Sequence, residues 1–298
     1  MPHIIVEAAE ELLDKEIPVL DKGFVRLVDY MGGDQRIVQS ARVSYGAGTK
    51  TVRQDRGLIN YLMKNWHTSP FEQVQLTFHA KMPIFVARQW VRHRTARLNE
   101  ISGRYSVMKD EFYVPQPEHI RPQSTDNKQG RSEDRYSPEE EQEIISLFER
   151  EQRAVYDNYQ ALLDKNVARE LARNNLPLSL YTEWYWQIDL HNLFQFLRLR
   201  MDAHAQYEIR AYAEAMAECA KAVAPLAYEA FEEHALGSVT FSRAECESLV
   251  ALLKGARPRL EGKPLLAFQA KLEKLESSQP EAEPEPAEGW YAPVTQTS

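Results

Sequence analysis

Cysteine and glycine are both scarce in this 298-residue sequence, and each shortage excludes a class of structure. The two cysteines, Cys219 and Cys246, form no spaced motif, which excludes the common structural zinc sites and predicts two reduced, buried thiols. Only 12 glycines are present, none of them in a glycine-rich phosphate loop, so nucleotide-binding folds built on such a loop are disfavoured.

Long apolar runs are also absent. No stretch approaches the roughly 18 apolar residues of a transmembrane helix, and the mean hydropathy is −0.53. The first five residues, MPHII, lack the basic start and the apolar core of a signal peptide. The sequence therefore predicts a cytoplasmic protein with no membrane partner.

Charge is unevenly distributed along the chain, whose net charge is −8. Residues 276–298 contain five acidic and no basic residues, which leaves a net charge of only −3 on residues 1–275. Within that part, residues 84–105 hold five arginines and one acidic residue, Glu100. A local excess of arginine in a mildly acidic protein indicates an anionic ligand rather than a general attraction to nucleic acid.

Periodicity and helix-capping signals predict a mixture of strands and helices. Period-2 alternation predicts strands over 23–30 and 73–81. Helix-period stripes and capping boxes predict the following helices: 34–44, 52–65, 83–92, 138–165, 168–173, one from about 180 or 185, 203–234, and a short one that starts at Ser242 and ends at Gly255. Residues 115–137 are polar and predict a surface loop or insertion. Because strands and helices form mostly separate groups, we expect an α+β fold in which helices pack on an antiparallel sheet.

The segment with the clearest chemical signal is residues 89–105, QWVRHRTARLNEISGRY. Three consecutive side chains, Arg92, His93 and Arg94, cannot all face one way on a helix, so we expect them to fan out at a helix end. Guanidinium groups suit phosphates and pyrimidine carbonyls. A solvated basic face is the alternative, but the preceding IFVARQW is apolar, and charge beside a core is costly unless it is paired or used.

The second half of this segment has polar groups suited to a nucleotide. Ser102, Gly103 and Arg104 combine a hydroxyl, an unhindered backbone N–H and a guanidinium, which is the chemistry of a phosphate-binding loop. Asn99 and Glu100 add hydrogen-bonding groups suited to ribose. The alternative role of Ser102 is that of a nucleophile, but a catalytic serine needs a neighbouring base and an oxyanion site.

Arg92-His93-Arg94, seven further residues and then Ser102 resemble the RHR-x7-S signature of the flavin-dependent thymidylate synthases. The likeness runs from about Asp21 to about Glu233 in several ordered blocks. These blocks are LDKGFVRLVDYMG near the start, ARVSYG at 41–46, HTSPFE at 67–72, IFVARQW at 84–90, LPLSLYTEWYW at 176–186 and LRLRMDAHAQYEIR at 197–210. The sequence is thus similar to this family over most of its length.

The resemblance implies an α+β fold and the synthesis of thymidylate (dTMP) from deoxyuridylate (dUMP). In the family, methylenetetrahydrofolate supplies the carbon, and NADPH reduces FAD, which supplies the reducing equivalents. The enzyme is a homotetramer whose sites are built from several subunits. The implied partners are therefore small molecules and further copies of the chain, with no nucleic acid, membrane or metal.

The resemblance also implies which residues of this sequence bind the ligands. For FAD the implied residues are Ser69, Arg92, His93, Arg94, Glu100, Asp189, Leu190, His191 and Gln195. For dUMP they are Gln89, Trp90, Val91, Arg92, Glu100, Ile101, Ser102, Gly103, Arg104, Arg173 and Arg200, with Ser102 and Arg104 at the phosphate.

Arg200 is the implied catalytic residue. Its guanidinium holds the uracil and favours ionisation at N3, and the negative charge that develops on the ring raises the nucleophilicity of C5. Arg198 lies two positions away on the expected helix, so one of these two arginines must face solvent.

We expect three parts along the chain. Residues 1–235 form the catalytic domain, with a polar insertion at about 118–137. A helical extension covers 236–275, and a disordered, acidic, proline-rich tail covers 276–298.

Three alternative functions follow from the same residues. Cysteine-dependent thymidylate synthesis needs a thiol nucleophile, but Cys219 lies in a plain helical context without a neighbouring arginine, so a mechanism without a thiol is expected. A nucleic-acid-binding module would spread basic and aromatic residues over a face, which the net charge of −3 on residues 1–275 argues against. A metal hydrolase would pair some of the eight histidines, but they are dispersed and form no HExxH motif.

Overall fold

A computed structural model describes residues 3–43, 52–125 and 130–277 of the chain. The chain divides into two compact units, residues 1–236 and residues 237–298. Among the helices in the described ranges, none is both long and apolar enough to cross a membrane.

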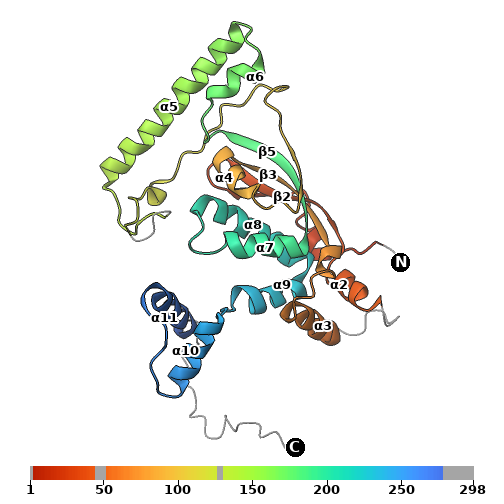
Figure 1. The fold of residues 1–298 in the computed structure, drawn as a ribbon. Helices are drawn as coiled ribbons and strands as arrows, with labels where there is room; N and C mark the ends of the chain where they lie inside the picture. The colour runs from red at the N-terminus through yellow and green to blue at the C-terminus, as the bar shows by residue number, and fades with distance from the viewer. Residues whose placement is uncertain (1–2, 44–51, 126–129, 278–298) are drawn as a thin grey trace, which may run out of the picture. The chain divides into compact units, whose positions relative to one another are not determined.

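The first unit is built on a five-stranded sheet in which every neighbouring pair is antiparallel (Figure 1). In spatial order the strands are β1 (Glu16–Val19), β2 (Gly23–Met31), β3 (Gln75–Pro83), β5 (Tyr181–Asp189) and β4 (Arg97–Glu100). The expected α+β fold with an antiparallel sheet is confirmed.

Alternation of apolar and polar side chains places this sheet against one core. In β3, Leu76, Phe78 and Ala80 are fully buried, whereas Thr77 and His79 on the other face are only half-buried. This period of two matches the pleat of a strand with one covered face.

The helices of the first unit lie between and after the strands. They are α1 (Glu7–Glu10), α2 (Asp34–Ala41), α3 (Val52–Lys64), α4 (Ile84–Trp90), α5 (Pro138–Asp164), α6 (Arg169–Ala172), α7 (Leu190–Arg200), α8 (Tyr207–Val223) and α9 (Pro225–Phe231), with a π-helical turn over Glu232–Leu236. Short 3-10 turns cover Phe71–Gln73, Pro117–His119 and Arg173–Asn175. Helix α8 packs against β1, β2, α4 and α7, and ten of its residues are buried. It is therefore the central helix of the core.

Trp90, the last residue of α4, joins three elements at the middle of this core. Its ring lies 5.3 Å from Trp184 and 5.4 Å from Trp186 of β5, and 5.2 Å from Phe196 of α7. Tilted and edge-on aromatic pairs at such distances stabilise packing beyond simple burial. The end of α4 is thereby fixed against both β5 and α7.

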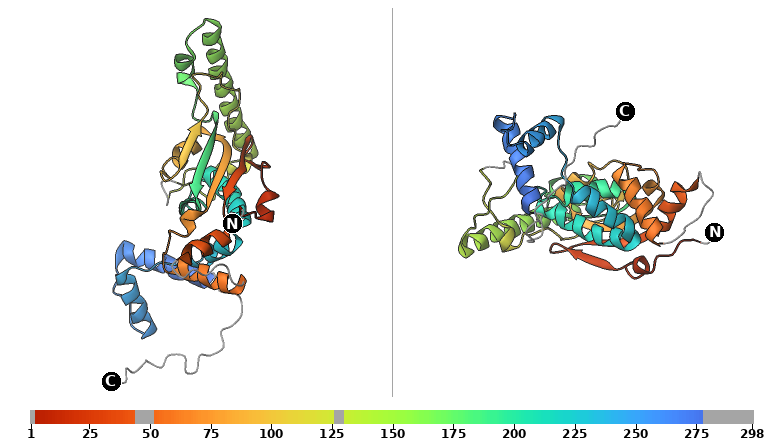
Figure 2. Two further views of the ribbon diagram at one scale, coloured as in Figure 1. Left: turned by 90° about the vertical axis from the view of Figure 1, so that its right-hand side faces the viewer. Right: turned by 90° about the horizontal axis from the view of Figure 1, so that it is seen from below.

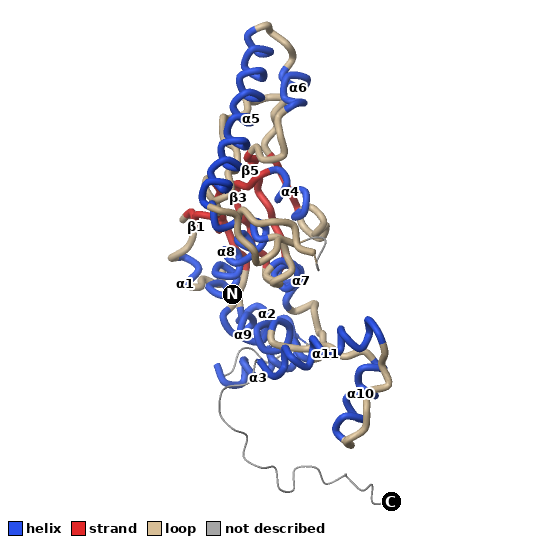
Figure 3. Tube along the Cα trace, turned by 90° about the vertical axis from the view of Figure 1, so that its left-hand side faces the viewer, coloured by secondary structure: helices blue, strands red, loops and turns tan. Residues whose placement is uncertain are grey.

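Helix α5 extends away from the sheet, as Figures 2 and 3 show. It begins with the expected capping box, in which Ser137 Oγ accepts from the Glu140 N–H and Glu140 accepts from the Ser137 N–H. Only Gln152 and Tyr159 of its 27 residues are buried. Tyr159 belongs to a small separate core that also contains Met108, Phe112, Ala172 and Leu180.

The second unit contains α10 (Arg243–Leu253) and α11 (Gly262–Ser277). The expected capping box at Ser242 and Glu245 is confirmed, and Gly255, with φ of +72°, follows the end of α10 in the left-handed conformation that glycine favours. Lys271 binds both carboxylate oxygens of Glu245 at 2.7 Å, so an ion pair ties the two helices together.

One expected helix is wrong in its first part. Residues 181–189, where a helix from about 180 or 185 was expected, form β5, which pairs with β3 along nine residues. Alternate residues over 182–188 are buried, so the period is two rather than 3.6. Helix α7 begins only at Leu190, where the Asp189 carboxylate accepts the N–H of Asn192 at 2.9 Å.

The single helix expected over 203–234 is also wrong. It is divided into α8 and α9 because Pro225 has no N–H and cannot continue the first helix. The first amides of α9, those of Leu226 and Ala227, donate to the Asp34 carboxylate at 2.8 and 2.9 Å. A carboxylate from a distant segment thus caps the new helix.

Several boundaries shift by a few residues. The strand expected over 73–81 runs from Gln75 to Pro83, so Pro83 is the N-cap of α4 rather than its first residue. Helix α4 ends at Trp90, before Arg92. The short edge strands β1 and β4 were not expected from the sequence, because four residues carry too little periodicity to identify a strand.

Some expectations fall partly outside the described residues. The end of the helix expected over 34–44, the block at 41–46 and the insertion at 118–137 each extend into such segments, and so does most of the tail at 276–298. Residues 276 and 277, the first two of the expected tail, belong to α11.

Candidate active site

The arginine-rich segment follows the end of α4, as expected. Arg92 and Arg94 are exposed, and His93 between them is half-buried. The His93 ring lies edge-on against Phe196 of α7, with ring centroids 4.8 Å apart. Because Trp90 anchors the end of α4, these three side chains start from a fixed backbone position.

Arg200, the last residue of α7, meets this group directly. Its Nε donates to His93 Nε2 at 3.0 Å, and its Nη2 donates to the backbone oxygen of Gln89 at 3.3 Å. The end of a helix favours a cation, because unpaired carbonyls there carry partial negative charge. Arg198 is exposed, so Arg198 is the one of the two arginines that faces solvent.

The charge state of this pair is set by burial. Loss of solvent, with the positive charge of Arg200 nearby, lowers the pKa of His93 to about 4. Burial also lowers the pKa of Arg200 from its ordinary value. His93 is therefore neutral near pH 7, and its Nε2 accepts the hydrogen bond from a charged guanidinium.

A cavity of about 360 Å³ opens beside the Arg200–His93 pair. Its lining consists of Arg92, His93, Arg94, Thr95, Ile188, Asn192, Gln195, Leu199 and Arg200. Three arginines and two side-chain amides offer many N–H donors and few acceptors. This composition suits a ligand with phosphate or carbonyl oxygens.

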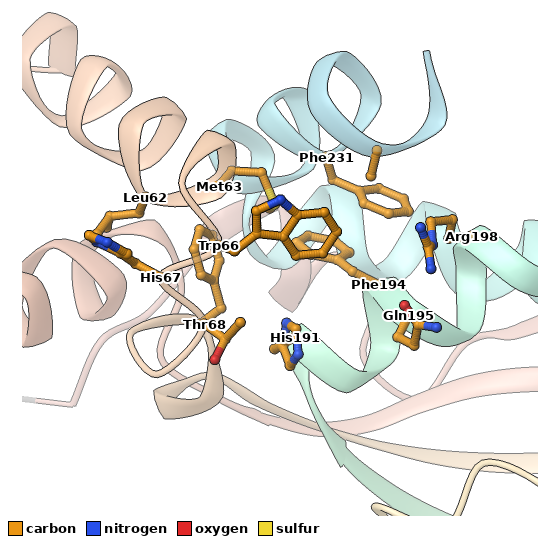
Figure 4. Close-up of a pocket in the computed structure, with 12 residues that line it drawn as sticks. Leu62, Met63, Trp66, His67, Thr68, His191, Phe194, Gln195, Arg198 and Phe231 are labelled. Carbon is orange, nitrogen blue, oxygen red and sulfur yellow. The ribbon is translucent and has the colours of Figure 1, made fainter. Parts of the chain in front are cut away.

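A second, smaller cavity of about 40 Å³ lies along another part of α7 (Figure 4). Figure 4 shows Trp66 in the middle of its lining, with His191, Gln195 and Arg198 of α7 around it. Thr68 also lines this cavity, and its hydroxyl donates to Glu72 at 2.9 Å. Gln195 lines both cavities, so this side chain connects them.

The residues expected at the flavin thus fall into several positions. Arg92, His93, Arg94 and Gln195 surround the larger cavity, and His191 lines the smaller one. Ser69 is exposed next to Thr68, Asp189 caps α7, and Glu100 accepts the hydroxyl of Thr182 at 2.6 Å. Leu190 is fully buried, and so is Trp90, which was expected at dUMP, so neither residue is exposed to a ligand in this chain.

The loop after β4 gathers a second group of the expected residues. Ile101 N–H donates to the backbone oxygen of Glu183 at 2.9 Å, and Arg104 N–H donates to Ser102 Oγ at 3.3 Å. A Cβ at Gly103 would lie 3.1 Å from the Arg173 guanidinium and 2.9 Å from Met108 Sδ. Glycine at this position therefore allows Arg173 to lie directly against the loop.

The two groups do not surround one cavity within the described chain. The loop after β4 contacts Glu183, whereas Ile188 lines the cavity beside Arg200. These two residues of β5 are five positions apart, which corresponds to about 17 Å along the strand. Ile101, Ser102, Gly103, Arg104 and Arg173 are absent from the lining of the cavity beside Arg200. One chain thus places the expected dUMP residues in two separate groups.

The thiol of Cys219 is not suited to act as a nucleophile. Cys219 is fully buried in α8, and burial raises the pKa of its thiol to about 12. Cys246 is exposed, so the expectation of two buried thiols is wrong for this residue, which lies in the second unit. The Ser102 hydroxyl accepts the Arg104 amide and makes no hydrogen bond to a basic side chain of the described residues, which favours a binding role.

Asn192 and Leu199 line the larger cavity and were not expected from the sequence. With Gln195 they recur at spacings of three and four residues on one side of α7. That spacing becomes informative only when the start of α7 at Leu190 is known.

Comparisons with known proteins show which family the chain resembles. The family described as thymidylate synthase complementing protein matches residues 26–226, and the thymidylate synthase ThyX C-terminal domain matches residues 239–277. The solved structure of a UMP/dUMP methylase, PolB, from Streptomyces cacaoi bound with 5-Br dUMP is similar, with a TM-score of 0.66 and 34% identity. The match covers 74% of this chain and 98% of that chain.

Two relatives, both named flavin-dependent thymidylate synthase, are more than 60% identical to this chain. The flavin-dependent thymidylate synthase of Treponema pallidum is 61% identical over 270 residues, which is 91% of this chain and 88% of the relative. The flavin-dependent thymidylate synthase of Treponema denticola is 64% identical over 260 residues, which is 87% of this chain and 98% of the relative. The chain therefore belongs to the flavin-dependent thymidylate synthase family.

Proposed function

We propose that the cavity beside Arg200 is where this chain converts dUMP to dTMP. Methylenetetrahydrofolate is the carbon donor, and NADPH is the reductant that acts through FAD. The observation that carries the proposal is the Arg200–His93 hydrogen bond, which holds a charged guanidinium at the wall of a donor-rich cavity.

Arg200 is the residue that activates the uracil. Its contacts with His93 and the Gln89 backbone fix the guanidinium before any ligand arrives. A fixed positive charge beside the ring stabilises negative charge at N3 and the carbonyl oxygens, which increases electron density at C5. No thiol is required, in keeping with the buried position of Cys219.

The hydrogen-bond donors that line the cavity beside Arg200 also suit FAD. Arg92 and Arg94 offer exposed guanidinium groups to a diphosphate, and Gln195 and Asn192 offer amides to the polar edge of a flavin ring. When bound, reduced FAD supplies the hydride that converts the transferred carbon to a methyl group. Neutral His93 places an uncharged ring at the wall of this cavity.

The loop Ile101–Arg104, with Arg173, is proposed to hold the dUMP phosphate. Ser102 supplies a hydroxyl, Gly103 an accessible backbone and Arg173 a second guanidinium. Because this group lies away from the Arg200 cavity in one chain, a complete site needs the loop of another copy. We therefore propose a homotetramer with shared sites.

The remaining expectations complete this proposal. Residues 1–235 are the catalytic domain, residues 236–275 an extension and residues 276–298 a tail that the reaction does not need. The protein works in the cytoplasm with small-molecule partners. Flavin absorbance of the purified protein, together with dTMP formation that requires both NADPH and methylenetetrahydrofolate, tests the activity itself.

Shared sites can be tested by complementation between two inactive variants. Arg200→Ala damages the cavity, and Arg104→Ala damages the phosphate loop. Each homo-oligomer should therefore be nearly inactive. When both variants are co-expressed, some mixed sites carry neither change, and dTMP synthesis should reappear. If the mixture stays as inactive as its components, the site is completed within one chain, and the proposal of shared sites is wrong.

A further inference from the structure

The insertion forms one wall of a cavity that the proposed reaction leaves without a role. This cavity, of about 940 Å³, is lined by residues from 118–123 and 130–135 and by residues from 203–210. Its lining includes four arginines and two histidines, namely Arg121, Arg131, Arg135, Arg210, His119 and His204. Glu118 and Glu133 are the two acidic residues in the lining, so the arginines outnumber them.

A buried ion pair fixes the insertion to the core at this place. Arg131 Nη2 lies 2.5 Å from Glu208 Oε1, and Glu208 is only 1% exposed. Burial raises the pKa of Glu208, but the hydrogen bond and charge of Arg131 bring the pKa below its ordinary value. The Tyr113 hydroxyl also donates to this carboxylate, at 3.0 Å. A buried carboxylate with these partners makes a rigid wall.

Two of the arginines keep their charge available to a ligand. Arg121 donates to the backbone oxygens of Glu118, Glu133 and Asp134, and none of these bonds neutralises its charge. Arg135 is exposed and makes no hydrogen bond or ion pair within the part of the chain that the structure describes. These two guanidinium groups suit the oxygens of an anion.

An aromatic pair lies beside these charges. The rings of His119 and Tyr207 stack with centroids 3.6 Å apart at an angle of 24°. Burial lowers the pKa of His119, so its ring is neutral near pH 7 and acts as an apolar surface. The guanidinium of Arg210 lies 5.9 Å from the centre of the Tyr207 ring. The cavity thus offers an aromatic surface next to positive charge.

Two glutamines, Gln206 and Gln89, connect this cavity to Arg200. Gln206 lines the cavity, and its amide oxygen accepts from Gln89 Nε2. The backbone oxygen of Gln89 in turn accepts from Arg200. The contacts of Gln89 thus link the wall of this cavity to Arg200.

We propose that this cavity binds the aminobenzoyl-glutamate end of the folate co-substrate. That end of a folate is an aromatic ring followed by carboxylates, which matches the His119–Tyr207 pair followed by Arg121 and Arg135. The inference rests on the proposed function, because it assigns one co-substrate of that reaction to the insertion. Additional glutamates on the folate tail should strengthen binding, since each adds a carboxylate.

Direct binding of a fragment tests this inference separately from the activity. The probes are p-aminobenzoyl-glutamate and its triglutamate, titrated calorimetrically into the full-length, FAD-loaded protein. Arg121→Gln combined with Arg135→Gln should weaken triglutamate binding about tenfold or more, since two charge-assisted hydrogen bonds are lost. Arg150→Gln, at an exposed arginine of α5 outside the cavity, is the matched control. If the double variant folds poorly, the single variant Arg135→Gln is titrated instead. This substitution removes no hydrogen bond or ion pair among the described residues.

Steady-state kinetics distinguish the possible outcomes. The KM for the triglutamated folate should rise about tenfold in the double variant, whereas the KM for NADPH should change less than about twofold. Unchanged fragment binding and folate KM in an active enzyme would overturn the inference and leave the proposed function intact. A selective rise in the KM for NADPH would overturn it too, by assigning the cavity to the dinucleotide phosphates. Absence of dTMP synthesis by the unmodified protein would instead contradict the proposed function.

Discussion

Replacing Arg200 with alanine is the most direct test of how the candidate site works. In the structure, two N–H groups of this guanidinium are used to hold it, one on His93 and one on the Gln89 backbone. A guanidinium has five N–H donors, so about three remain to face the cavity. These remaining donors, with the positive charge, are the part that the alanine variant removes from the uracil.

The size of the effect follows from this geometry. Loss of a pre-positioned donor at developing negative charge costs about 3–4 kcal/mol, which is a factor of about 10²–10³ in the chemical step. Arg200→Lys should recover little, because a point charge cannot keep the contacts with His93 and Gln89 and also present a planar fork to the ring. Folding should be affected much less, by about 1 kcal/mol, since the hydrogen bond to His93 is only partly buried.

The assay is dTMP formation in a single turnover, quenched rapidly at saturating dUMP with FAD already reduced. Arg153→Ala, at an exposed arginine of α5, is the control for loss of a surface charge. The reasoning requires a slower single turnover in Arg200→Ala at saturation, with FAD still bound. If the single-turnover rate is unchanged and only dUMP binding is weaker, Arg200 is a binding residue and does not activate the ring.

The remaining predictions concern protonation, the thiols and folding. The pKa of His93 is lowered to about 4, so FAD binding should be constant from pH 8 to about 5; a binding step near pH 6.5 that disappears in His93→Gln would contradict a neutral His93. The double variant Cys219→Ala/Cys246→Ala should fold with a loss of about 1 kcal/mol and retain turnover; a folded, FAD-loaded variant that makes no dTMP would disprove a thiol-free mechanism. Burial raises the pKa of Asp34 to about 6, above its unfolded value, so the folded state binds the proton more tightly and stability is lost as pH rises from about 4 to 6. Urea unfolding should show that loss, up to about 3 kcal/mol, in the unmodified protein and not in Asp34→Asn; equal pH slopes would show that Asp34 is not the group responsible.

Features set by nearby residues could be predicted from the sequence. The capping boxes at Ser137 and Ser242 need only residues three apart, and both are present. The position of Arg92, His93 and Arg94 just after a helix end is likewise set by nearby residues. In each case the interaction is local, so no knowledge of the rest of the fold is required.

Strand β5 could not be distinguished from a helix by composition alone. It contains large apolar side chains on both faces, because Tyr181, Trp184 and Trp186 are buried and Tyr185 stacks on His79. An apolar run of this kind is compatible with either period. Pairing with β3, about a hundred residues earlier in the sequence, decides the matter, and that partner is known only from the fold.

The contact between Arg200 and His93 is likewise beyond local sequence reasoning. The two residues are 107 positions apart, and they meet because Trp90 packs against both β5 and α7. The resemblance to a family selected both residues without showing that they touch. What the structure adds is the physical link, a neutral histidine that accepts from the arginine and fixes its direction.

The RHR-x7-S spacing has a structural meaning that differs from that of a compact loop. Within the seven-residue spacer, residues 97–100 form β4, with Arg97 opposite Gln187 and Glu100 opposite Trp184. An extended strand of this length carries the chain about 10 Å along β5, away from the Arg200 cavity and toward Glu183. The spacer thus separates His93 from Ser102 in one chain. This separation supports the proposed shared site, in which each copy supplies the arginine pair to one nucleotide and the phosphate loop to another.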